Sequence, residues 1–83
     1  MLKVYRVVAS FSAEQLRKLR PRRETFEVGD LLVVLTSDGA HTVFCPYEEA
    51  KELSNRSRFM VADAVFERCT EASEQGSSPR NED

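Results

Sequence analysis

The sequence has few cysteines, few glycines and no long apolar run, and each shortage excludes a class of protein. Two cysteines in 83 residues are too few for a disulfide framework, so we expect a reducing compartment and a cytoplasmic protein. No apolar run approaches the ~20 residues of a membrane helix, so we expect no membrane partner. The three glycines, at Gly29, Gly39 and Gly76, lie far apart and form no glycine-rich phosphate loop.

The remaining composition is typical of one small globular domain. Hydrophobic residues make up 41% of the chain, charged residues make up 31%, and the formal net charge is −2. So small a net charge does not by itself indicate a nucleic-acid or membrane partner. From residue 70 onward small and polar residues dominate. We therefore predict a single domain over residues 1–69 and a disordered acidic tail over residues 70–83.

The run Leu31–Leu35 is the clearest strand in the sequence. Five consecutive apolar residues between turn signals suit a strand that is buried on both faces. Asp38 and Gly39 follow, and they favour a tight turn because glycine tolerates positive φ and aspartate can bond nearby backbone. His41–Cys45 would then be the second strand of a hairpin.

Two helices are predicted from their start signals. Ser12 is a good N-cap, Gln15 completes a capping box with it, and Pro21 would end this helix after about two turns. Pro46 suits the first position of a second helix, which we expect to end near Asn55.

Three further stretches are predicted as strands. Leu2–Ala9 and Phe59–Arg68 are rich in β-branched and aromatic residues. Thr25–Thr36 is extended but interrupted at Gly29–Asp30, which is either a β-bulge in one strand or a two-residue hairpin turn. We favour the bulge, because the stretch before it is short.

These elements predict an α+β fold, with a small, mainly antiparallel sheet of four to five strands and two short helices in the order β-α-β(β)-β-α-β. The alternative is an SH3-like curved barrel with inserted helices. In the first arrangement the apolar strand Leu31–Leu35 lies at the sheet edge, where it invites pairing with another chain. A second copy could cover that edge, so the sequence also predicts a homodimer.

A basic segment is the sharpest candidate binding site. Its five cationic side chains could neutralise phosphates, and arginine adds bidentate geometry. The simpler interpretation is that several of them lie in the last turn of the first helix, where cations favour the helix dipole. The five residues are Arg17, Lys18, Arg20, Arg22 and Arg23.

Other chemistry-bearing residues carry weaker signals. His41 and Cys45 share one strand face, but with Cys69 they lack the spacing and the fourth ligand of a zinc site. Asp63 interrupts an apolar strand, where it could transfer protons or mark the solvent side of the strand. We favour the second role, and we predict no metal site, no cofactor and no enzyme.

The sequence therefore predicts a small non-enzymatic binding or accessory module. We expect it to contact another protein, or its own copy, through an apolar sheet edge. The alternative function is nucleic-acid or phosphate binding through residues 17–23.

Overall fold

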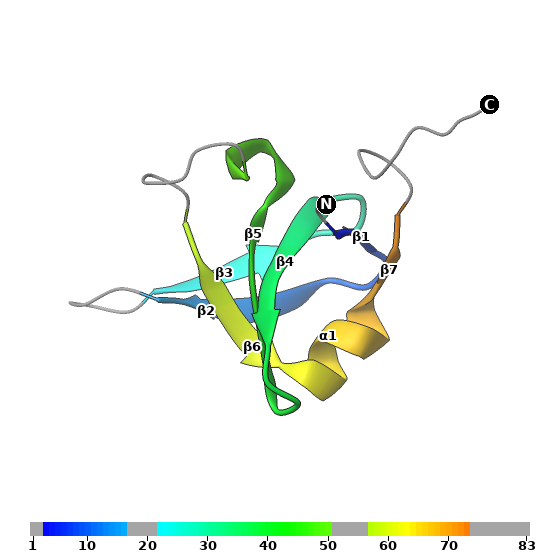
Figure 1. The fold of residues 1–83 in the computed structure, drawn as a ribbon. Helices are drawn as coiled ribbons and strands as arrows, with labels where there is room; N and C mark the ends of the chain where they lie inside the picture. The colour runs from blue at the N-terminus through cyan, green and yellow to red at the C-terminus, as the bar shows by residue number, and fades with distance from the viewer. Residues whose placement is uncertain (1–2, 17–21, 51–56, 74–83) are drawn as a thin grey trace.

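One antiparallel sheet makes up most of the fold (Figure 1). The computed structural model describes residues 3–16, 22–50 and 57–73. In these ranges the elements are β1 (Val4–Val7), β2 (Phe11–Gln15), β3 (Arg23–Phe26), β4 (Leu31–Ser37), β5 (His41–Pro46), the 3₁₀ helix η1 (Tyr47–Glu49), β6 (Phe59–Ala62), α1 (Asp63–Cys69) and β7 (Thr70–Ala72). The strands lie in the order β3-β2-β6-β5-β4-β1-β7, and every neighbouring pair is antiparallel.

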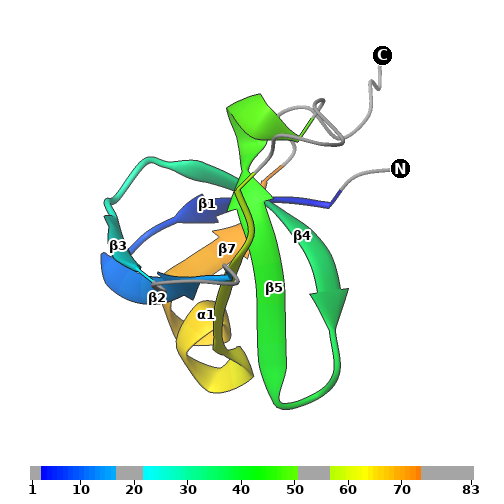
Figure 2. The same ribbon diagram turned by 90° about the vertical axis from the view of Figure 1, so that its left-hand side faces the viewer.

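The predicted α+β fold with four to five strands and two helices is wrong. The described residues form seven strands and one α-helix, and the sheet curves into a half-barrel in which β2 and β3 lie across β4 and β5 (Figures 1 and 2). The curved-barrel alternative is closer to this arrangement. A strongly curved sheet can enclose a core without a layer of helices.

The predicted helix at Ser12 is instead strand β2. Phe11 and Ala13 are buried in the core, whereas Ser12 and Glu14 are more exposed. This alternation is the two-residue period of a strand. The Ser12 hydroxyl lies 3.2 Å from the hydroxyl of Thr25 on β3 rather than capping a helix. Burial of the inward side chains overrides the capping signal, because a cap contributes only about 1 kcal/mol.

The expected long strand over Thr25–Thr36 is also wrong. It divides into β3, which pairs with β2, and β4, which pairs with β1 and β5, so β3 and β4 form neither one bulged strand nor a hairpin. The connecting turn has Gly29 at φ +102°, and the Asp30 carboxylate accepts a hydrogen bond of 2.9 Å from the Glu27 N–H. The register shift in β4 comes later, between Val34 and Thr36.

The predicted strand Phe59–Arg68 ends early. β6 stops at Ala62, and Asp63–Cys69 forms α1 with Phe66 and Cys69 buried. The second predicted helix begins at Pro46 only as the short η1, and its predicted end at Asn55 lies outside the described residues. Thr70–Ala72, which we assigned to the tail, pairs with β1 as β7, and residues 74–83 lie outside the described residues.

The concave face of the sheet holds a phenylalanine core. All five phenylalanines of the chain belong to it, with α1 supplying one ring. Phe44 is fully buried and its ring centroid lies 5.4 Å from that of Phe66 and 5.9 Å from those of Phe11 and Phe59. Aromatic pairs at this spacing add to the stabilisation from burial.

The hairpin of β4 and β5 was predicted correctly, with Gly39 at φ +90° in its turn. β4 is buried on both faces, because Leu32 packs in the phenylalanine core and Val33 packs in a second cluster with Val4 and Cys45. However, β4 is a central strand, and the outermost strands of the described sheet are β3 and β7. The prediction that Leu31–Leu35 forms an apolar sheet edge is therefore wrong, since β4 has a partner strand on each side in the described sheet.

Candidate functional site

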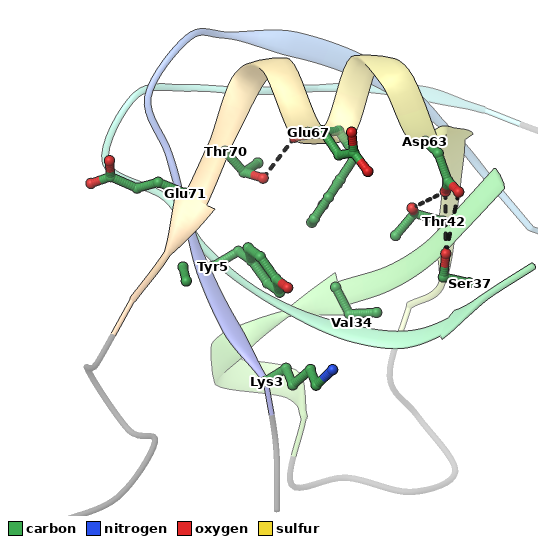
Figure 3. A pocket seen from close by; sticks show the side chains of 11 residues that line it. Lys3, Tyr5, Val34, Ser37, Thr42, Asp63, Glu67, Thr70 and Glu71 are labelled. Atoms are coloured by element: carbon green, nitrogen blue, oxygen red, sulfur yellow. Dashed lines mark hydrogen bonds between the residues drawn. The ribbon is translucent and has the colours of Figure 1, made fainter. Parts of the chain in front are cut away.

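A pocket of about 370 Å³ opens beside α1, between the helix and strands β1, β4, β5 and β7 (Figure 3). We call it the α1 pocket. The Tyr5 ring forms one wall and meets the Phe66 ring edge-on, with the centroids 5.3 Å apart. The polar side chains around it are Lys3, Ser37, Thr42, Asp63, Glu67, Thr70 and Glu71.

Asp63 joins α1 to the β4–β5 hairpin at one end of this pocket. Its carboxylate accepts a hydrogen bond from the Thr42 hydroxyl, and the Ser37 hydroxyl lies 3.3 Å from both carboxylate oxygens (Figure 3). Its backbone N–H donates to the Ala40 carbonyl at 2.9 Å. Asp63 is therefore the first residue of a helix, not the strand residue that we predicted, and its carboxylate is held by hydroxyl groups.

The polar groups around the α1 pocket are hydroxyls, carboxylates and one amine. Among the described residues that line it there is no histidine or cysteine. His41, the one histidine of the chain, lines a different pocket together with Met60 and Val65. The hydroxyls of Ser37 and Thr42 both donate to the Asp63 carboxylate.

Cys45, Cys69 and His41 do not come together in the structure. Cys45 lies in the cluster with Val33 on the convex face of the sheet, whereas Cys69 lies in the phenylalanine core on the concave face. Both cysteines are buried and neither forms a disulfide, while His41 is exposed. Across residues 3–16, 22–50 and 57–73, no three His, Cys, Asp or Glu side chains are grouped so that they could hold a metal ion.

The structure describes only part of the predicted basic site. Arg17, Lys18 and Arg20 lie outside the described residues. Arg22 and Arg23 are exposed, and Arg23 lies directly opposite Glu14 in the pairing of β3 with β2. An acidic side chain in this position offsets the positive charge that a phosphate would need.

A groove beside β3 is a second concave site, and sequence reasoning missed it. It consists of two adjoining hollows of about 210 and 270 Å³ that share Asp30, Leu31 and Glu48. We call it the β3 groove. Its lining is Glu24, Thr25 and Phe26 from β3, Gly29, Asp30, Leu31 and Leu32 from the turn and β4, and Pro46, Tyr47 and Glu48 from the end of β5 and η1.

The backbone of β3 has one side without a partner strand. The Gln15 N–H donates to the Arg22 carbonyl at 2.6 Å, which makes this a hydrogen-bonded pair one step beyond the opposed residues Glu14 and Arg23. Opposed pairs in an antiparallel ladder alternate between hydrogen-bonded and non-hydrogen-bonded. The N–H and C=O groups of Arg23 and Thr25 therefore point away from β2, toward the free edge of the described sheet.

One signal in the sequence could have indicated this edge. The segment Arg23–Phe26 is short and carries two charged residues, and it stands before a turn at Gly29. Short charged strands are typical of sheet edges, where they limit unspecific pairing.

Comparison with known proteins adds no relative: no protein-family model, curated protein or solved structure matches the chain. Among the described residues, no helix has the length and apolar character that crossing a membrane requires.

Proposed function

We propose that the protein is a small non-enzymatic module that binds another protein chain by adding an extended segment of that chain to β3. The observation that carries this proposal is the free edge of β3, where Arg23 and Thr25 present backbone hydrogen-bonding groups. An extended peptide that adds to such an edge gains main-chain hydrogen bonds, and adjacent hollows accept its side chains.

The β3 groove supports this mode of binding. It runs along the strand through Glu24, Thr25 and Phe26, and its other wall comes from β4 and the end of β5. β7, the other outermost strand, has three residues against four in β3. The proposal replaces the apolar edge that we expected with a polar one.

The test uses two variants at Thr25. In Thr25→Pro the outward N–H is lost but no backbone hydrogen bond to β2 is removed, because that N–H points away from β2 and proline is tolerated on edge strands. Thr25→Val is the matched control, since it also loses the hydroxyl beside Ser12 but retains the N–H. Eight-residue peptides selected from a random library on the wild-type protein should bind Thr25→Val and lose at least tenfold in affinity for Thr25→Pro.

Slower amide exchange at Arg23 and Thr25 in the peptide complex should accompany this loss. Equal binding to both variants would contradict strand addition, as would a library that yields no binder. Thermal unfolding of both variants checks that they fold. If the selected sequences match β3 itself, the partner is a second copy of this chain, and the solution mass should be that of a dimer.

Two further expectations stay proposals. We place the protein in the cytoplasm, because its two cysteines form no disulfide, the usual state in a reducing compartment. Nucleic-acid binding through residues 17–23 stays a prediction, and salt-dependent retention on nucleic acid would check it. The described residues do not favour it, since they hold ten carboxylates against six lysines and arginines.

A further inference from the structure

We infer that the segment added to β3 carries lysine or arginine side chains, which pair with the carboxylates of Glu24, Asp30 and Glu48. This inference rests on the proposed function and names the chemistry of the partner. The three carboxylates come from β3, the turn before β4, and η1, and all three line the β3 groove.

No positive charge among the described residues offsets them. The lining of the groove contains no lysine or arginine. In the described part of the chain the ion pair that forms is between Arg6 and Glu71, on β1 and β7. One oxygen of Asp30 accepts the Glu27 N–H, while Glu24 and Glu48 are exposed. A cation entering the groove would therefore meet acceptors that have no cationic partner in the described residues.

The side chains of β3 alternate between its two faces, and this places Glu24 and Arg23 on opposite faces of the strand. Successive side chains of a strand point to opposite faces, so Glu24 faces the groove and Arg23 faces the other side, where it lines a pocket with His41 and Met60. An added strand would lie about 4.8 Å from β3, with its side chains paired across in the same alternation. Its basic residues should therefore occur at every second position.

The floor of the groove suits the stems of such side chains. Leu31 and Pro46 are half-buried and apolar, and they line the same hollow as the acidic residues Glu24 and Glu48. Lysine and arginine bury their methylene stems on apolar surface while the charged group stays near water. The groove thus offers both parts of the contact that a basic side chain makes.

The experiment compares three eight-residue peptides in which lysine, glutamine or glutamate alternates with threonine. Affinities are measured by isothermal titration at low and at physiological salt. We expect the lysine peptide to bind about tenfold more tightly than the glutamine peptide at low salt, since each exposed ion pair contributes about two- to fivefold. We expect the glutamate peptide to bind least.

The double variant Glu24→Gln/Glu48→Gln should abolish this preference for lysine. The control variant Glu14→Gln/Glu67→Gln removes two exposed carboxylates outside the groove and should leave the preference unchanged. Asp30 is left in place, because its carboxylate holds the turn at Glu27.

The outcomes separate the two proposals. Equal affinity for the lysine and glutamine peptides, with both lost in Thr25→Pro, would overturn the inference about charge and support strand addition. A preference for lysine that needs Glu24 and Glu48 but survives in Thr25→Pro would support the charge selectivity and contradict strand addition. A preference that persists in Glu24→Gln/Glu48→Gln would contradict the assignment of the groove.

Discussion

The carboxylate of Asp63, the first residue of α1, accepts a hydrogen bond from the buried hydroxyl of Thr42, the second residue of β5. Ser37, at the end of β4, lies within hydrogen-bond distance of the same carboxylate. One side chain thus connects the helix to both strands of the neighbouring hairpin. Since Phe66 belongs to α1, this contact helps to hold the Phe66 ring in the core.

We expect Thr42→Val to lower the free energy of unfolding by about 1–2 kcal/mol, because a buried hydrogen bond to a charged group is lost while the side-chain shape is kept. Ser37→Ala is the matched control. Its hydroxyl is exposed and its hydrogen bonds are longer, at 3.3 Å, so its loss should cost less than about 1 kcal/mol. Urea unfolding measures both, and equal stabilities of Thr42→Val and the wild type would contradict the structural role of Asp63.

The turn between β4 and β5 should be sensitive to acid. The Asp38 carboxylate accepts hydrogen bonds of 2.8 Å from the N–H groups of His41 and Ala40, and these bonds lower the pKa of Asp38 below its ordinary value of 3.8. Because the folded state favours the charged carboxylate, its stabilisation is complete above that ordinary value. The stabilisation is lost as the pH falls through the lowered pKa of the folded state.

The measurement compares wild type with Asp38→Asn by urea unfolding at pH 6 and at pH 3. The advantage of the wild type in free energy of unfolding should be smaller at pH 3. A carboxyl resonance of Asp38 that titrates above 3.8 in the folded protein would contradict the expectation. So would an advantage that is the same at both pH values.

The two thiols should report global unfolding from opposite faces of the sheet. Cys45 is 0% exposed and Cys69 is 8% exposed, so neither should react with an aromatic disulfide reagent until the surrounding structure opens. The variants Cys45→Ala and Cys69→Ala each leave one thiol to follow. Both thiols should react at rates that slow in parallel as stability rises, and a thiol that reacts within seconds in the native protein would contradict its placement.

The local signals in the sequence differ in how far they could be trusted. The hairpin of β4 and β5 was predictable because Leu31–Leu35 has too many apolar residues for a surface strand and because Gly39 supplies a turn that few other residues can adopt. The capping box at Ser12 was misleading, since its contribution is small beside the burial of Phe11 and Ala13. The stretch before Phe66 is apolar at both parities, so periodicity could not separate a strand from a helix there.

The sequence by itself determined that Leu32 and Val33 are buried, because a continuous apolar run leaves water whatever the topology, and it determined the hairpin, whose signals lie within about fifteen residues. Only the tertiary structure decided that the apolar strand is central and that a polar strand forms the edge, since strand order depends on how the whole sheet closes around its five phenylalanines. The β3 groove was likewise decided only by the tertiary structure. Glu24, Asp30 and Glu48 are brought to one groove by the curvature of the sheet, which no local pattern encodes.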